Sequence, residues 1–305
     1  MNIVIIGQGA IGLLWYFKLS QCANNHVTLR CSGNVNNVPN SMTFTDSKQQ
    51  QHQQILTLAS DEHLQQAELI IYCLKAYALE QAHQQYQTFF NKNAALIFSH
   101  NGLLNVQSFD VQVNSDQAIA AMLMTHGSLK NDNFNITHTG EGKSDIGLIA
   151  GNIPEKRRIK LVDTLDKALP LVTWQKDIKI QQWIKLAINC VINPLTAINN
   201  CNNGEVTNKK FKQKIEGILH EVVMIARKHN VSLSLTELIQ TVLNVANNTA
   251  LNCSSMRSDI LTSRKTEIDH INGFIHQQGL IYHISTPHNT ALWQQIKKLE
   301  TEYSS

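Results

Sequence analysis

The sequence predicts an α/β fold in which a doubly wound, mostly parallel sheet is followed by an all-helical domain. Three observations support this prediction. The first half alternates short apolar runs with amphipathic stretches, the second half carries long helical patterns with few strand signals, and a glycine-rich turn joins a strand to a helix at residues 7–12. Strands that alternate with helices are typical of a doubly wound sheet.

The predicted strands are apolar runs of four to eight residues. They lie at residues 2–6, 26–30, 68–74, 94–99 and 118–125. Runs such as ELIIYCL at 68–74 are apolar on both faces, as in parallel strands that helices cover on each side. The remaining patterns predict a helix over 11–23, a polar loop over the glutamine-rich residues 48–54, and a hairpin or paired strands over 135–148.

Long helical patterns dominate the chain after Trp174. They cover residues 178–193, 209–229, 235–250 and 264–277, and a last helix begins at Thr286-Pro287, where threonine can cap and proline can occupy the first turn. We therefore expect a dinucleotide-binding domain over 1–176 and a helical substrate domain over 177–305. A cleft between two domains is the usual place for a ligand.

Composition narrows the class of protein. The chain has 305 residues, 43% of them apolar, and its net charge of +3 is spread without the basic block typical of nucleic-acid binding. Six cysteines form no CxxC pair or zinc-like spacing, so no metal site is predicted. Apolar runs stay below the roughly 20 residues that cross a bilayer. These features favour a cytoplasmic protein without nucleic-acid or membrane partners.

The turn after the first predicted strand has the GxGxxG pattern of a dinucleotide site. Such glycines allow a tight turn and let the backbone approach a pyrophosphate at the helix N-terminus. A GxGxxG alone is weak evidence, but here a strand precedes it and a helix follows. We therefore expect a Rossmann-type site in which the cofactor contacts Gly7, Gln8, Gly9, Ala10, Ile11 and Gly12.

The residue that ends the second strand indicates whether the cofactor is NAD or NADP. Sites for NAD usually carry an acid there, which binds the ribose 2′-hydroxyl. This chain has Arg30, whose guanidinium suits a 2′-phosphate through paired hydrogen bonds. The alternative is a solvated surface arginine. We predict NADPH as the cofactor.

The helix predicted over 178–193 carries polar residues at every fourth position. Lys185, Asn189 and Asn193 form one stripe on a segment that is otherwise almost entirely apolar. Buried ammonium and carboxamide groups are costly unless they have partners, and a bound substrate would provide them. The alternative is a lysine that reaches water at the helix edge, with Asn193 capping the helix before Pro194. This pattern alone leaves both readings open.

Two longer motifs resemble the ketopantoate reductase (2-dehydropantoate 2-reductase) family. They are KLAINCVINPLTAINNCNNGE at 185–205 and SSMRSDILTSRKTEIDHINGF at 254–274. The glycine turn, Leu74-Lys75-Ala76 and His100-Asn101-Gly102 also lie where that family has them. The resemblance implies a C-terminal domain of the 6-phosphogluconate dehydrogenase type. It also implies reduction of ketopantoate by NADPH to (R)-pantoate, on the route to pantothenate and coenzyme A.

The resemblance also implies a role for each matching residue. Lys185 would donate the proton, Glu267 would bind the substrate hydroxyl and Ser255 its carboxylate. Asn101 would contact both substrate and cofactor, and Lys75 and Arg30 would bind the cofactor. The other substrate-binding residues would be Asn189, Asn193 and Asn203. The chemistry fits these residue types, because an ammonium can stabilise and then protonate the oxygen that becomes negative during hydride transfer.

The sequence departs from the family pattern at two positions, and two other functions are possible. Arg257 stands where an apolar residue is expected, and Leu104 where a glycine is common. One alternative is a related dehydrogenase for another keto or hydroxy acid. The other is a dinucleotide-binding sensor without catalysis, which would not need Lys185, Asn189 and Glu267 together. The oligomeric state stays open, with a homodimer as the candidate.

Overall fold

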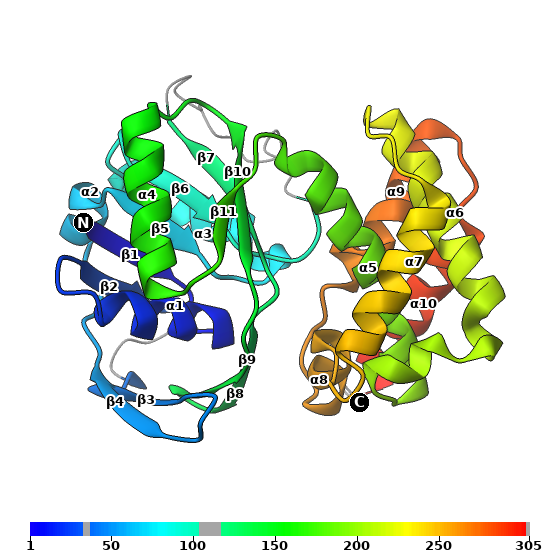
Figure 1. The fold of residues 1–305 in the computed structure, drawn as a ribbon, viewed down its shortest axis with the longest axis horizontal. Coiled ribbons are helices and arrows are strands. Elements are labelled where there is room, and N and C mark those ends of the chain that lie inside the picture. Colours follow the sequence, from blue (N-terminus) through cyan, green and yellow to red (C-terminus); the bar gives the residue numbers. More distant parts are fainter. Residues whose placement is uncertain (33–36, 104–116, 303–305) are drawn as a thin grey trace. The chain divides into compact units, whose positions relative to one another are not determined.

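The computed structural model describes residues 1–32, 37–103 and 117–302, and these residues divide into two compact units (Figure 1). The first unit comprises residues 1–100 and 117–178, and the second comprises residues 101–103 and 179–302. The short segment Asn101–Leu103 therefore belongs with the helices, although the sequence placed it in the α/β domain.

A seven-stranded sheet forms the centre of the first unit, in the order β11-β10-β7-β6-β5-β1-β2. The five strands from β2 to β7 pair in parallel, whereas β10 runs antiparallel to β7. The chain leaves β1 for β2 and then returns to β5 on the other side of β1, so the end of β1 is a topological switch point, where such sheets bind ligands. The strands are β1 Asn2–Ile6, β2 His26–Arg30, β5 Leu69–Tyr72, β6 Ala95–Phe98, β7 Ile119–Met124, β10 Ser144–Ala150 and β11 Val172–Trp174.

Helices cover both faces of this sheet. Residues Ile3 and Ile5 of β1 pack in one apolar cluster with α1 (Ala10–Ser20) and α4 (Glu155–Ala168). The alternate residues Val4 and Ile6 pack with α2 (Asp61–Gln66) and α3 (Ala76–Tyr86), which is followed by the 3₁₀ turn η2 (Gln87–Phe89). This arrangement confirms the predicted doubly wound fold and explains why the strands are apolar on both faces.

A second, four-stranded sheet corrects two of the predictions. Its order is β4-β3-β9-β8, with β3 Ser41–Thr45, β4 Gln51–Ile55, β8 Gly127–Asp132 and β9 Asn135–Gly140. The polar loop predicted over 48–54 is wrong, because Gln51–Ile55 pairs antiparallel with β3. The strand is exposed along most of its length, so backbone pairing forms it without the apolar alternation that marks half-buried strands.

The strands predicted within 135–148 are confirmed, but they do not pair with each other, so the predicted hairpin is wrong. Both halves are strands, but β9 pairs with β3 and β8, whereas β10 pairs with β7 and β11. Two strands that follow each other closely in sequence thus belong to different sheets, a choice that local patterning does not reveal.

Every regular element described in the second unit is a helix. One apolar cluster includes residues of each α-helix and contains Trp183, Leu219, Val242 and Ile296. No helix in the described part of the chain combines the length and apolarity needed to traverse a bilayer. The elements are α5 Ile178–Asn199, η4 Asn203–Thr207, η5 Lys209–Phe211, α6 Lys212–Lys228, α7 Leu235–Asn248, α8 Ser255–Leu261, η6 Ile268–His270, α9 Asn272–Tyr282 and α10 Pro287–Glu302.

Two helices have boundaries that differ from the predictions by more than one helical turn. The helix predicted to end at Asn193 continues through Pro194 to Asn199, so Asn193 is not a C-terminal cap. The helix predicted over 264–277 begins only at Asn272. Thr266 in the preceding segment donates its backbone N–H and its hydroxyl to Glu300 Oε1, at 2.8 and 2.7 Å, instead of starting a helix.

Candidate active site

The glycine turn is shaped by contacts that exclude side chains at two of its three glycines. Gly7 has a φ of +115°, a left-handed conformation that favours glycine, and a Cβ there would lie 2.5 Å from the Cys73 carbonyl oxygen. A Cβ on Gly12 would lie 2.0 Å from the carbonyl oxygen of Gly7. Both glycines are therefore required by the packing of the chain itself.

Gly9 differs, because it leaves room at the N-terminus of α1. The nearest atom to a Cβ at Gly9 would be the Cys73 carbonyl oxygen at 3.8 Å, an ordinary contact distance. Gly9 is also the N-cap of α1. Because glycine has no side chain, it cannot cap the first backbone N–H groups of the helix. The free backbone N–H groups at a helix N-terminus favour an anion. The turn thus fits the pyrophosphate of a dinucleotide, and the absent side chain at Gly9 keeps the approach open.

Two residues of β8 hold the turn, and the sequence analysis missed both. The Ser128 hydroxyl donates to the carbonyl oxygen of Ala10 at 3.2 Å, and Lys130 Nζ donates to that of Gln8 at 3.0 Å. They share one face of the strand because they are two residues apart. No local pattern could have identified them, since β8 comes to α1 only through the second sheet.

Arg30 ends β2 as predicted, but its guanidinium already has partners in the protein. It donates to the Ala59 carbonyl oxygen at 2.8 Å and to Asp61 Oδ1 at 3.0 Å, and it lies over the ring of Tyr86 at 4.8 Å. Arginine has five N–H donors, so these contacts leave donors for a phosphate. Asp61 is about half exposed and places a negative charge beside the predicted 2′-phosphate site.

Lys75 is the N-cap of α3, three residues after the end of β5. Strands β1, β2 and β5 are parallel neighbours, so the glycine turn, Arg30 and Lys75 all follow the same edge of the sheet. The structure therefore brings the predicted cofactor residues of the first unit to one edge.

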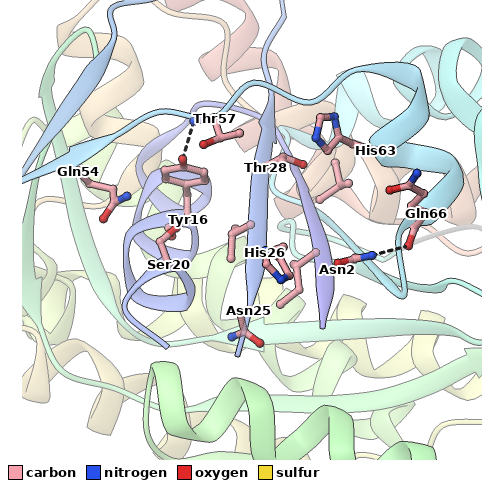
Figure 2. A pocket seen from close by; sticks show the side chains of 13 residues that line it. Asn2, Tyr16, Ser20, Asn25, His26, Thr28, Gln54, Thr57, His63 and Gln66 are labelled. Atoms are coloured by element: carbon pink, nitrogen blue, oxygen red, sulfur yellow. Dashed lines mark hydrogen bonds between the residues drawn. The ribbon is translucent and has the colours of Figure 1, made fainter. Parts of the chain in front are cut away.

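A hollow of about 490 Å³ lies beside β2 (Figure 2). It lies beside this outermost strand of the sheet. Nearby, the Tyr16 hydroxyl donates to the Ile55 carbonyl oxygen and accepts from the Thr57 N–H, at 2.9 and 2.8 Å. Among the described residues that line it, none is a predicted site residue. It is thus distinct from the glycine turn.

The helical unit brings together four of the predicted residues. Asn101 Nδ2 donates to Glu267 Oε2 at 2.8 Å, and Asn189 Nδ2 donates to Asn101 Oδ1 at 3.4 Å. Burial lowers the pKa of Lys185 to about 8, and the negative charge of Glu267 limits that decrease. Because Glu267 is only 4% exposed, the cluster is a partly desolvated pair of opposite charges with two carboxamides.

Two neighbouring features hold Asn101 and Glu267 in place. Gly102 has a φ of +91°, and a Cβ there would lie 2.6 Å from the His270 carbonyl oxygen, so only glycine allows this close approach. Thr266, beside Glu267, is fixed by the two hydrogen bonds to Glu300 described above. From the sequence, Gly102 could be recognised only as part of the His100-Asn101-Gly102 motif. The contact of Thr266 could not be predicted, since Glu300 lies 34 residues further along the chain.

The remaining predicted substrate residues have different surroundings. Asn193 is buried, one turn beyond Asn189 on α5. Asn203 is buried, and its Nδ2 donates to Thr249 Oγ1 at 3.0 Å, while its Oδ1 has no hydrogen-bond partner within the described structure. Ser255 is the first residue of α8 and is exposed, whereas the adjacent Ser254 is buried and accepts from the Thr196 hydroxyl at 2.7 Å.

Of the two departures from the family pattern, Arg257 can be placed, and it lies outside this cluster. Arg257 donates to the side-chain oxygens of Asn200 and Asn202, at 3.0 and 2.6 Å, and so links α8 to the loop that follows α5. Leu104 lies outside the described residues. Among the described residues, no group of three or more His, Cys, Asp or Glu side chains could hold a metal ion.

Comparison with known proteins gives matches over almost the whole chain. The family model described as Ketopantoate reductase PanE/ApbA matches residues 3–151, and the model of its C-terminal domain matches residues 177–300. A 2-dehydropantoate 2-reductase from Vibrio cholerae is 34% identical over 316 residues, which cover 100% of this chain and 99% of that protein.

The chain belongs to the ketopantoate reductase family. The family resemblance drawn from the motifs is thereby confirmed. Solved structures agree on the fold: a ketopantoate reductase of the same family from Ralstonia eutropha superposes with a TM-score of 0.87 at 22% identity, over 100% of both chains. A D-mandelate dehydrogenase solved with NADH and anilino(oxo)acetate superposes with a TM-score of 0.90, also at 22% identity and over 100% of both chains.

The contrast between Gly9 and Gly12 gives a test of the cofactor site. Gly9→Ala is expected to fold normally but to weaken dinucleotide binding about tenfold or more, because a methyl group enters the space left for the pyrophosphate (about 1.4 kcal/mol per tenfold). Gly12→Ala is the matched control and should lower the melting temperature, since its Cβ meets backbone. Cofactor fluorescence titration and thermal unfolding measure the two effects. Unchanged dinucleotide affinity in Gly9→Ala would contradict the assignment.

Proposed function

We propose that this protein reduces ketopantoate to (R)-pantoate with NADPH, using Lys185 as the proton donor. The main support is the partly buried cluster of Lys185, Glu267, Asn101 and Asn189, in which an ammonium lies beside a carboxylate and two carboxamides. Family membership supports the reaction class, and the relatives named as 2-dehydropantoate 2-reductases support the substrate.

Each polar group in the cluster has a task that its chemistry suits. The Lys185 ammonium would bind the keto oxygen, stabilise the negative charge that develops there and then transfer a proton to it. Its pKa of about 8 keeps it mostly protonated at neutral pH while making proton release easier than from an exposed lysine. Asn189 and Asn193 would orient the substrate from the same face of α5.

Specificity would come from Glu267 and its neighbours. The hydroxyl of ketopantoate can donate to the Glu267 carboxylate, because an ionised carboxylate accepts hydrogen bonds only. Asn101 donates to Oε2 of this carboxylate and so helps to hold it in place. Ser255 and Asn203 would complete the substrate contacts, Ser255 toward the carboxylate.

The first unit would hold the cofactor. The glycine turn from Gly7 to Gly12 would bind the pyrophosphate, and Arg30 and Lys75 would contact the rest of the dinucleotide at the same sheet edge. When bound, the nicotinamide supplies the hydride. The direct test is NADPH oxidation by purified protein, followed by absorbance, with ketopantoate added and other 2-keto acids as comparison substrates.

The oligomeric state and compartment belong to the same proposal, a cytoplasmic homodimer. Adjacent apolar side chains near the end of α9, Leu280 and Ile281, are 65% and 63% exposed, and a second copy of the chain would cover them. Sedimentation velocity distinguishes a dimer from a monomer.

The pKa of Lys185 predicts how the reaction depends on pH. Since the proton donor must be charged, kcat/KM for reduction should be constant below about pH 7 and should fall as Lys185 loses its proton near pH 8. Glu267→Gln removes the charge that raises this pKa, so the fall should move to lower pH. Lys185→Ala should lower kcat by about 10²–10⁴-fold without loss of folding. A fall at the same pH in wild type and Glu267→Gln would show that another group titrates.

The Glu267 carboxylate predicts a preference between two closely related keto acids. 2-Ketoisovalerate lacks the hydroxymethyl group of ketopantoate, and a site built to bind a hydroxyl can reject such an analogue by about 10⁴-fold. In Glu267→Ala the ratio of the two kcat/KM values should shrink to roughly tenfold or less. Any effect of the substitution on Lys185 applies to both substrates, so the ratio isolates the hydroxyl contact. An unchanged ratio would place the specificity elsewhere.

The contact between Arg30 and Asp61 gives a paired test of NADPH preference. Arg30→Ala should weaken NADPH binding about 10- to 150-fold, as expected for a charged hydrogen bond of about 1.5–3 kcal/mol. Asp61→Asn should strengthen NADPH binding up to about fivefold, because it removes a partly exposed negative charge beside the phosphate. NADH binding should change little in either variant. The assignment is supported if NADPH affinity falls in Arg30→Ala and rises in Asp61→Asn. It is contradicted if Arg30→Ala loses as much affinity for NADH as for NADPH.

A further inference from the structure

Helix α5 contains a proline at a position where the helix needs a backbone donor. In an α-helix, the N–H of residue i bonds to the carbonyl of residue i−4. Pro194 has no N–H, yet α5 continues to Asn199. The carbonyl oxygen of Cys190, a residue that is 0% exposed, therefore has no partner at residue 194. A buried carbonyl without a partner is costly, so another group must bind it.

Asn272, the first residue of α9, supplies that donor from elsewhere in the helical unit. Its Nδ2 donates to the Cys190 carbonyl oxygen at 3.0 Å and to Asn289 Oδ1 at 2.9 Å. Asn272 and Asn289 are both 0% exposed. The amide thus uses both of its N–H groups on acceptors, and the reversed orientation would set oxygen against oxygen at both contacts.

The orientation of Asn272 is set by a buried carboxylate. Asn289 Nδ2 donates to Glu221 Oε2 at 2.7 Å and to the Ile218 carbonyl oxygen at 3.2 Å. Glu221 also accepts from the backbone N–H groups of His288 and Asn289, at 2.8 and 2.9 Å. An ionised carboxylate only accepts, so the nitrogen of Asn289 faces Glu221 and its oxygen is left for Asn272.

We propose that Asn272 is a positioning residue for the substrate-facing stripe of α5. Asn189 directly precedes Cys190, and Asn193 directly precedes Pro194, so the bond at the Cys190 carbonyl would set how these two carboxamides are spaced and aimed. Asn272 touches neither substrate nor cofactor in this assignment. It acts through the backbone of α5, and the inference rests on the substrate-binding role proposed above for that stripe.

The test is a variant pair that removes the donor and then restores it on the backbone. Asn272→Ala should lower kcat/KM for ketopantoate by up to about a hundredfold, as expected for displacement of substrate-positioning groups by about 1 Å. Cofactor affinity, measured by fluorescence titration, should stay unchanged. In Pro194→Ala/Asn272→Ala, the new N–H at residue 194 can bind the Cys190 carbonyl, so most of the lost kcat/KM should return.

A matched control separates this role from a general effect on the helix. Asn199 Nδ2 donates to the Leu195 carbonyl oxygen on the same helix at 2.7 Å, beyond the proline. Asn199→Ala should leave kcat/KM near that of the wild type. The fall of kcat/KM near pH 8 should not move in Asn272→Ala, because Lys185 precedes the affected turn.

The outcomes discriminate between the alternatives. If Asn272→Ala lowers only the melting temperature, or if the double variant is no more active than Asn272→Ala, the positioning role is wrong. Should Asn272→Ala fail to fold, Asn272→Ser keeps one polar donor, and its smaller loss should be recovered by Pro194→Ala in the same way. Thermal unfolding of the four proteins in the Pro194/Asn272 cycle needs no substrate. It therefore tests the hydrogen bond between Asn272 and Cys190 whether or not the protein reduces ketopantoate. If wild type does not reduce ketopantoate, the proposed function is wrong, and this measurement still tests the bond.

Discussion

The Lys185 ammonium lies in a buried region of the helical unit, and this burial constrains the residues around it. Burial lowers the pKa of Lys185 to about 8, and the Glu267 carboxylate keeps it from falling further. A charge in such a place is tolerated only when an opposite charge and hydrogen bonds accompany it. Glu267 in turn is held by Asn101, and the close approach of Gly102 to His270 brings the segment of Asn101 to it.

The proposed cofactor site of the first unit depends mainly on backbone geometry. Its glycine turn lies at the switch point of the sheet, with Gly7 and Gly12 required by internal packing and Gly9 leaving space. The charge arrangement beside it is less expected, because Asp61 pairs with the arginine predicted to bind a phosphate. A carboxylate there favours a cofactor without a 2′-phosphate. The relative contributions of Asp61 and Arg30 would therefore set the preference between NADH and NADPH.

The fold by itself leaves the substrate open. A D-mandelate dehydrogenase and a ketopantoate reductase superpose on this chain about equally well, with TM-scores of 0.90 and 0.87, at the same 22% identity. Function on a shared fold depends on the side chains of the site. In this chain the groups that would select a substrate lie on α5 and on the segment before α9, and both are positioned by contacts with distant parts of the helical unit.

The sequence by itself determined the layered α/β architecture, the glycine turn and the polar stripe of α5, because these depend on local periodicity and on residue types at fixed spacing. Motif resemblance added Asn101 and Glu267. Tertiary structure decided the rest: β4 forms by pairing with β3, β9 and β10 separate into two sheets, and Glu267 precedes α9 because Thr266 bonds to Glu300. The donor that Pro194 lacks comes from Asn272, 82 residues from the Cys190 carbonyl that it binds. Local patterns do not specify contacts between residues so far apart in sequence, since many pairings would satisfy the same buried group, and only the packed fold selects one.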